Sequence, residues 1–188
     1  MILLNFNTLA RIAEELNKSE ALWAVGASVM LYFNGLVKKP NDIDILASEK
    51  DIEKVKNVLG NLGEMTFDGC NEGKDPYLTR YFYKYKVDDT HIDLIAGFRI
   101  KNEQGIYEMP FDEKTVASYG KANDVSIPLC SLEDWYVLYQ LMEGREAKVK
   151  LIEDYLVNNG INNMELLKRT LNENLPESIK SNVEKLID

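Results

Sequence analysis

The chain has 188 residues, of which 45% are hydrophobic, which is enough for one domain with a core. Acidic residues outnumber basic ones by 31 to 22, giving a net charge of −9. So acidic a protein is a poor candidate for broad nucleic-acid binding, which needs basic surface to displace counterions. We also expect a cytoplasmic protein without a membrane segment, because the start of the sequence lacks a signal peptide and no apolar stretch approaches the roughly 20 residues that span a bilayer.

The cysteine and histidine content argues against zinc. Cys70 and Cys130 are far apart in the sequence, so we interpret them as reduced thiols. With His91 as the one histidine, a zinc site would need several carboxylates as further ligands.

Hydrophobic spacing predicts an α/β arrangement in the first two thirds of the chain. Helices are expected over 8–17 and 28–33, and a third begins at Ser48, which with Asp51 resembles a capping box. Strands are expected over 22–25, 43–47 and 64–67, followed by a loop over 68–76. A tyrosine-rich strand over 78–87 and a strand over 91–98 should pair antiparallel across a turn at residues 88–89. Residues 99–127 hold only weak strand signals, near Ile106 and Val116.

The character of the sequence changes from Ser131 onward. Ser131 and Asp134 form a second capping box, which opens a helix that runs to Met142. Further helices are expected over 145–157, 164–172 and 178–187. We therefore divide the chain into an α/β core over 1–128 and a helical region over 129–188.

Three carboxylates stand out against this background. Asp42 and Asp44 alternate on a strand, so both side chains point to the same face, where their repulsion favours a cation between them. Asp93 lies within the apolar run 92–96, where a charge is unexpected unless it is paired or binds metal. If the two strands are neighbours, the three carboxylates converge on one or two magnesium ions, as two-metal phosphoryl or nucleotidyl transfer requires. Alternatively, Asp42 caps a turn, Asp44 points to solvent and Asp93 sits on an edge strand.

A small-residue turn precedes these carboxylates. Gly26, Ala27 and Ser28 follow a predicted strand and open a helix, so backbone N–H groups there could bind phosphate oxygens. A plain strand-to-helix turn is the alternative.

Together, Gly26-Ala27-Ser28, the segment 35–46 with Asp42-Ile43-Asp44, and the segment 91–95 with Asp93 resemble the signature of the DNA polymerase beta-like nucleotidyltransferase superfamily. The similarity is greatest to small bacterial and archaeal domains related to antibiotic nucleotidyltransferases and to toxin-type nucleotidyltransferases. It implies a nucleotidyltransferase fold, in which a short, mixed, twisted sheet is flanked by helices and followed by a helical C-terminal part.

The resemblance also implies roles for individual residues. Gly26 and Ser28, with Ala27 between them, would contact the triphosphate. Asp42 and Asp44 would bind both metal ions, magnesium or alternatively manganese, and Asp93 would hold the catalytic ion and help to deprotonate the acceptor. The chain differs from the family pattern at Ala27, which replaces the second glycine, and in the one-residue shift of Ser28.

Basic residues complete the expected phosphate site. Lys38 takes the place of the family's arginine and would grip phosphate as a point charge. Arg145 and Lys148 share one face of a predicted helix and could reach the β- and γ-phosphates. The alternative for Arg145 and for Lys148 is an ordinary solvated charge.

Other residues have two interpretations each. Tyr81, Tyr83 and Tyr85 could stack on a nucleobase, although strand packing is the commoner reason for such a stripe. Arg80 could contact phosphate or the acceptor. His91 could assist proton transfer or make a structural hydrogen bond.

The sequence thus predicts a magnesium-dependent transfer of a nucleoside monophosphate from a nucleoside triphosphate to an unknown hydroxyl acceptor, with release of pyrophosphate. A catalytically inactive nucleotide-binding or regulatory module is the first alternative. The second is a toxin–antitoxin component that acts with a protein partner.

Overall fold

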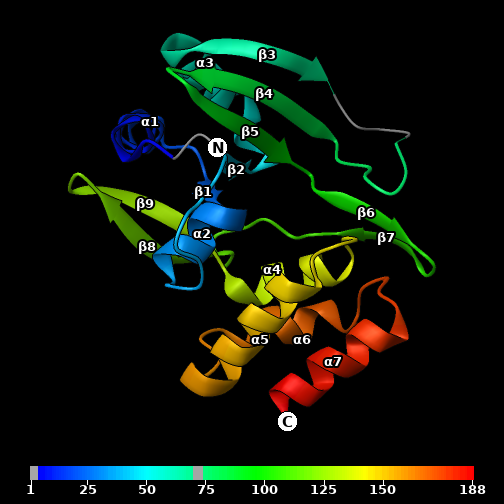
Figure 1. Cartoon of the computed structure of the whole chain (residues 1–188). Coiled ribbons are helices and arrows are strands. Elements are labelled where there is room, and N and C mark those ends of the chain that lie inside the picture. The colour runs from blue at the N-terminus through cyan, green and yellow to red at the C-terminus, as the bar shows by residue number, and fades with distance from the viewer. Residues whose placement is uncertain (1–3, 70–73) are drawn as a thin grey trace.

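The computed structural model describes residues 4–69 and 74–188 and shows a mixed α/β fold (Figure 1). Its main element is a seven-stranded sheet in the order β3-β4-β5-β2-β1-β9-β8, and β6 and β7 form a separate hairpin. The strands are β1 (Trp23–Val25), β2 (Ile43–Ala47), β3 (Glu64–Gly69), β4 (Tyr81–Val87), β5 (Thr90–Ala96), β6 (Arg99–Asn102), β7 (Gly105–Glu108), β8 (Val116–Ala122) and β9 (Val125–Cys130). The sheet is mixed, since β2 pairs parallel with β5 and β1 parallel with β9, whereas the other pairs are antiparallel.

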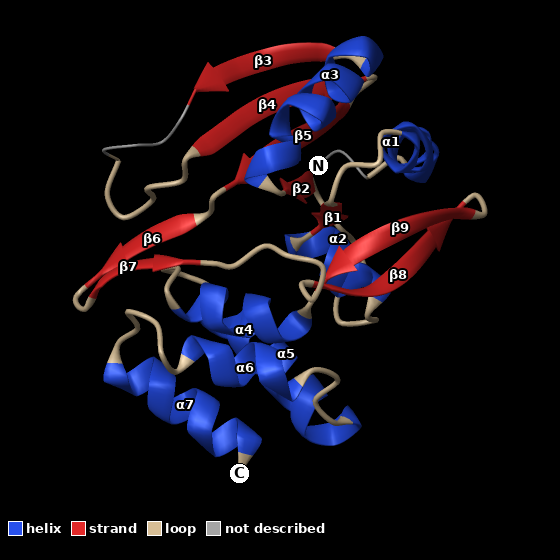
Figure 2. Ribbon diagram, turned by 180° about the vertical axis from the view of Figure 1, so that it is seen from behind, coloured by secondary structure: helices blue, strands red, loops and turns tan. Residues whose placement is uncertain are grey.

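The helices fall into two groups. In the first group, α1 (Phe6–Lys18) packs against β8 and β9, α2 (Ala27–Phe33) against β2, and α3 (Ile52–Leu62) against β3 and β4, where Figure 2 shows it lying across the strands. The second group gathers beyond one end of the sheet and contains α4 (Leu132–Gln140), α5 (Glu146–Asn159), α6 (Met164–Thr170) and α7 (Glu177–Ile187). No helix in the described ranges combines the length and the apolar character that crossing a bilayer requires.

Most of the predicted elements are confirmed, and the expected antiparallel pairing of β4 with β5 is present. The weak strand signals near Ile106 and Val116 correspond to β7 and β8. The strands β6 and β9 were missed. The segment that forms β9 contains Pro128, a residue that normally argues against a strand inside a sheet because it cannot donate to the ladder.

The expected capping box at Ser48 is wrong in its details. Ser48 precedes a short 3-10 helix (Glu49–Asp51), and its side chain caps no backbone N–H. Its hydroxyl instead donates to Asp51 Oδ2 at 2.6 Å, and the same oxygen accepts the backbone N–H of Leu22 at 3.1 Å. Asp51 therefore ties the start of α3 to the segment before β1, and these hydrogen bonds, with that of Lys54, lower its pKa to about 2.

The second capping box, at Ser131, is confirmed. Its hydroxyl accepts the N–H of Asp134 at 3.1 Å and donates to Asp134 Oδ2 at 2.7 Å. Every residue from Leu132 to Tyr139 is buried, so α4 is the central helix of the C-terminal group. Cys130, just before this cap, is a free, buried thiol, and burial raises its pKa; Cys70 lies outside the described residues.

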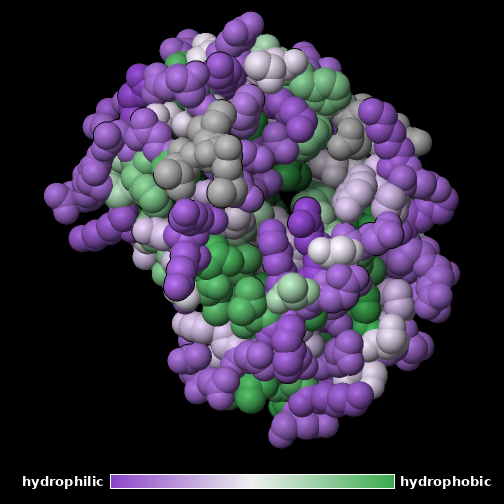
Figure 3. Space-filling view, viewed as in Figure 1, coloured by the Kyte–Doolittle hydropathy of each residue, from purple (hydrophilic) through white to green (hydrophobic). Residues whose placement is uncertain are grey.

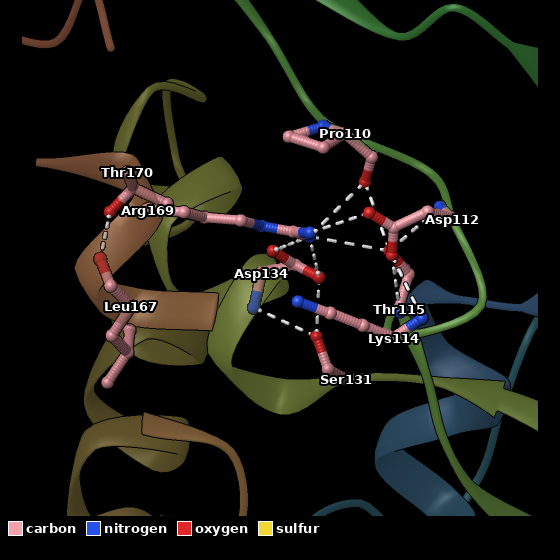
Figure 4. A network of polar contacts seen from close by, with 9 residues as sticks. All are labelled: Pro110, Asp112, Lys114, Thr115, Ser131, Asp134, Leu167, Arg169 and Thr170. Carbon is pink, nitrogen blue, oxygen red and sulfur yellow. Dashed lines mark hydrogen bonds and ion pairs between the residues drawn. The ribbon is translucent and has the colours of Figure 1, made fainter. Parts of the chain in front are cut away.

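A polar network centred on Arg169 links two C-terminal helices, α4 and α6, to each other and to the segment between β7 and β8 (Figure 4). Arg169 on α6 donates to both carboxylate oxygens of Asp134, at 2.9 and 3.0 Å, and to Asp112 at 3.1 Å. Its guanidinium also reaches the carbonyl of Pro110 at 3.5 Å and the hydroxyl of Thr115 at 3.4 Å. Burial raises the pKa of Asp134, and Arg169 and the Ser131 hydroxyl oppose that rise, so both favour the charged carboxylate.

We expect Arg169→Met to lower the free energy of unfolding at pH 7 by about 3 kcal/mol, because it leaves the buried Asp134 carboxylate without its cationic partner. Urea unfolding measures the change. Lys168→Met is the matched control on the same helix, since Lys168 makes only an exposed ion pair of 3.8 Å with Glu165. In a double mutant with Asp134→Asn the two effects should be less than additive. A loss below about 1 kcal/mol for Arg169→Met would contradict the assignment of a central role to this pair.

Candidate active site

The parallel pairing of β2 with β5 brings the three predicted carboxylates to one face of the sheet. Asp44 lies directly opposite Asp93 in the register of these two strands. Asp42 lies immediately before β2 and lines the same cavity as Asp44 and Asp93. The sequence expectation that the two strands are neighbours is therefore confirmed.

The carboxylates line a cavity of about 410 Å³ between the sheet and the C-terminal helices. On the polar side it is lined by Ser28, Asn41, Asp42, Asp44, Asp93, Arg145 and Lys148. The other lining residues are Ala27, Tyr77, Thr79, Phe82, Ile95, Phe98, Trp135, Tyr139 and Met142. Figure 3 shows a mostly hydrophilic surface that is hollowed near the centre of the view.

Asp44 has the most strongly shifted pKa of the carboxyl groups that line this cavity. Burial raises its pKa to about 7, and the negative charges of Asp93 and Asp42 push it in the same direction. Lys148 and Arg145 oppose the rise, but they do not cancel it. A carboxyl group held this far from its ordinary pKa is a site at which an added cation gains favourable energy.

Two cations face the carboxylates from the helical side. Arg145 lies immediately before α5, and Lys148 is in its first turn. Burial, and then the neighbouring charge of Arg145, lower the pKa of Lys148, whereas Asp44 raises it. Lys148 Nζ also lies 3.4 Å from the hydroxyl of Tyr139. This pair of cations suits an anionic group placed between α5 and the sheet.

A third cation, Lys84, approaches from the sheet itself. It lies opposite Asp93 in the β4–β5 register, with Nζ 3.6 Å from Asp93 Oδ1. Burial raises the pKa of Asp93, and Lys84 opposes that rise.

The small-residue turn joins β1 to α2 beside the carboxylates. The N–H of Gly26 donates to the carbonyl of Asp44 at 2.9 Å, which fixes the turn to β2. Ala27 has a φ of +42°, in the left-handed region that favours glycine. The Ser28 hydroxyl accepts the N–H of Asn41 at 3.1 Å and points to the carbonyl of Asp42 at 3.4 Å, so it supports the start of β2 as well as lining the cavity.

The oxygen-rich donor set fits a hard divalent cation. Magnesium usually binds one or two protein carboxylates and completes its shell with water and phosphate, so it needs no closed protein cage. Accordingly, within residues 4–69 and 74–188 no group of three or more His, Cys, Asp or Glu side chains is already arranged around a metal position. Burial first, and then the charges of Asp93 and Asp42, raise the pKa of Asp44, so a bound cation would favour its ionised form.

The same sheet face becomes apolar two residues beyond Asp93. Ile95 follows Asp93 on β5, and Phe82 lies opposite Ile95 on β4. With Tyr77 and Phe98 they form a largely aromatic wall of the cavity. Such a wall suits a flat, weakly polar ring beside the charged half of the site.

Several predicted candidates lie elsewhere. Lys38 is exposed and does not line the cavity. Arg80 forms ion pairs with Glu49 at 2.6 Å and Glu108 at 3.0 Å, so it is engaged outside the site. His91 is exposed, and Gly26 is buried beneath the turn without lining the cavity.

The tyrosine stripe of β4 packs in the protein interior and does not line the cavity. Tyr83 and Tyr85 are buried, and Lys56 of α3 lies over the Tyr83 ring with Nζ 4.4 Å from its centroid. The aromatic residue of β4 that does line the cavity is Phe82, on the opposite face of the strand.

Sequence reasoning missed Lys84 and the aromatic wall. The hairpin turn at residues 88–89 was predicted, and counting back from it places residue 84 opposite residue 93, as observed. The signal for Lys84 was therefore available. Tyr77, Phe98 and Trp135 reach the cavity from separate elements, and no local pattern marks them.

Comparison with known proteins finds similar solved structures but no similar sequences. No model of a protein family matches the chain, and no curated protein matches it by sequence. Solved structures do match. A Thermotoga maritima protein provisionally assigned as a nucleotidyltransferase is 18% identical over 80% of this chain and 91% of that one, with a TM-score of 0.59.

Two antibiotic-modifying proteins are similar as well. The antibiotic-resistance factor ANT(2'')-Ia is 10% identical over 96% of this chain and 91% of that one, with a TM-score of 0.56. The lincosamide antibiotic adenylyltransferase LnuA, in its lincomycin-bound structure, is 16% identical over 81% of this chain and 98% of that one, with a TM-score of 0.52. The chain thus has the nucleotidyltransferase fold, and the fold expected from the sequence is confirmed.

We expect Gly26→Ala to destabilise the protein by about 2 to 3 kcal/mol, because the added methyl would overlap the buried Trp135 ring and approach Leu46 Cδ1 to 3.0 Å. Denaturant unfolding measures the loss. Gly60→Ala is the control. Gly60 lies in α3, where a Cβ meets nothing within 4 Å, so alanine should stabilise the helix by up to about 1 kcal/mol. Equal stability of Gly26→Ala and wild type would show that α4 is not fitted against this turn.

The metal-free protein should gain stability when Asp44 is neutralised. The native pKa of Asp44, about 7, lies above the ordinary aspartate pKa of 3.8, so the native state binds more protons than the unfolded state between these pH values. Stability therefore falls as pH rises through this window. We expect Asp44→Asn to raise the free energy of unfolding by about 1 to 3 kcal/mol at pH 8 and to have little effect near pH 4. Unfolding of both proteins by urea, with EDTA, tests this; coincident curves at pH 8 would refute it.

Proposed function

We propose that this protein is a metal-dependent nucleotidyltransferase, which moves a nucleoside monophosphate from a nucleoside triphosphate to a hydroxyl acceptor and releases pyrophosphate. The observation that carries the proposal is the convergence of Asp42, Asp44 and Asp93 on one sheet face, opposite Arg145 and Lys148 across the same cavity. The fold shared with an adenylyltransferase supports it.

Each side of the cavity has its own task in this proposal. Arg145 and Lys148 bind the β- and γ-phosphate oxygens and hold the leaving pyrophosphate against α5. Ala27 and Ser28 border the triphosphate from the turn before α2, and Gly26 beneath them gives the turn its shape. Lys38 is exposed and does not line the cavity, so we assign it no direct contact with the triphosphate.

The carboxylates act on the metal and the acceptor. Asp42 and Asp44, with Asp93, would hold magnesium, or manganese in its place, and the bound ion would serve as a Lewis acid at the α-phosphate and neutralise charge on the leaving group. Asp93 orients the acceptor hydroxyl and accepts its proton as the new phosphate ester bond forms. Asp44 must be fully ionised for this, which requires either a pH above about 7 or a bound cation.

The two regions of the chain have different roles in this proposal. Residues 1–128 act as the catalytic core, and residues 129–188 supply the phosphate-binding cations and pack against the core through α4. The acceptor is a small molecule or a protein side chain in preference to a nucleic acid, since the net charge of −9 disfavours a polyanion.

Labelled nucleoside triphosphates with magnesium or manganese test the proposal through pyrophosphate release and transfer of label. We expect Asp93→Ala to lower the rate at least about 100-fold, because the proton acceptor is lost. Arg145→Ala and Lys148→Ala should mainly weaken nucleotide binding. Asp89→Asn is the control, since Asp89 is 90% exposed in the hairpin turn and pairs with Lys86, away from the cavity.

The outcomes separate the alternatives. Nucleotide binding without turnover would instead indicate the inactive binding or regulatory module. Turnover that appears only after a co-purified protein is added would indicate a two-component system. Absence of both nucleotide and metal binding would refute the proposal.

A further inference from the structure

Lys84 occupies a position beside Asp93, the carboxylate that would have to be available to bind a metal ion. Its ammonium lies 3.6 Å from Asp93 Oδ1, and the two residues face each other across the β4–β5 pair. Because directly opposed residues of an antiparallel pair point to the same face, Lys84 is on the face that carries the three carboxylates. In the metal-free protein it therefore supplies positive charge at one end of the acidic row Asp42, Asp44 and Asp93.

The contact is loose enough to be exchanged. At 3.6 Å the separation of the two groups exceeds that of a well-formed hydrogen bond, and the exposed fractions of the side chains are 47% for Lys84 and 27% for Asp93. An ion pair of this kind contributes little to stability. Lys84 Nζ also lies 5.2 Å from the centroid of the Phe82 ring, which gives the ammonium a second favourable contact when it leaves the carboxylate.

We propose that Lys84 is a stand-in counter-ion for Asp93, which the divalent metal displaces when the site is loaded. The inference rests on the proposed function, because it requires Asp93 to be a metal ligand. One carboxylate cannot give full charge compensation to an ammonium and a divalent cation together, so the two compete. Lys84 thereby weakens metal binding to the empty enzyme and limits the repulsion between Asp93 and Asp44 until metal and nucleotide arrive.

Direct titration with Mn²⁺, followed by the electron paramagnetic resonance of the free ion at pH 8, tests the competition without any turnover. We expect Lys84→Met to bind Mn²⁺ about fivefold more tightly than wild type, which corresponds to the upper range for an exposed ion pair. Lys84→Arg keeps the charge and should stay within about twofold of wild type. The rise in melting temperature at saturating Mn²⁺ should be larger for Lys84→Met than for wild type.

The matched control is Lys86→Met. Lys86 lies on the same strand and the same face, two residues from Lys84, but opposes His91 and pairs with Asp89 at 3.2 Å. Its loss removes the same charge from the protein while leaving Asp93 untouched, so Mn²⁺ affinity should change by less than about twofold.

Two negative outcomes are distinguishable. Mn²⁺ binding of equal or lower affinity in Lys84→Met than in wild type would overturn the role of Lys84 while leaving the proposed function intact. Failure of wild type and of Lys84→Met to bind Mn²⁺, with or without a non-hydrolysable nucleotide, would overturn both. An equal gain in Lys86→Met would reduce the effect to net charge and would also overturn the inference.

Discussion

The arrangement of this protein's candidate site depends on one strand pairing, that of β2 with β5. Parallel alignment in this register puts Asp44 beside Asp93, and Asp42, immediately before β2, lines the same cavity. Three like charges at this spacing repel one another, and burial adds to the cost at Asp44, whose pKa rises to about 7. Repulsion among these carboxylates is therefore unfavourable in the fold, and a cation bound between them would relieve it.

The rest of the fold supplies partial compensation from two directions. Arg145 and Lys148 approach from α5, and Lys84 approaches from β4. The helical cations depend on the position of α4, which is fitted against Gly26 through Trp135 and fixed through Asp134 to Arg169. The position of α4 thus depends on Trp135, which lines the cavity, and on the buried Asp134–Arg169 pair outside it.

Local patterns predicted most helices and strands, the antiparallel β4–β5 pair and the three carboxylates. They succeeded because amphipathic spacing, caps and a two-residue turn are written in neighbouring residues. They failed for β6 and β9. In β9 a proline interrupts the strand pattern, although the strand pairs antiparallel with its neighbour β8 across the turn at Asn123 and Asp124 and meets β1 at one register position, Val25 opposite Leu129.

The sequence by itself determined which residues carry charge into the sheet and which face of each strand they occupy, since a side-chain period of two needs no knowledge of the fold. Only the tertiary structure decided which faces meet. It placed Lys38 and Arg80 outside the cavity, brought Phe82 into it in place of the tyrosines, and set Arg145 and Lys148 opposite the carboxylates. These outcomes follow from strand order and helix packing, which are contacts between segments distant in the chain and leave no local pattern.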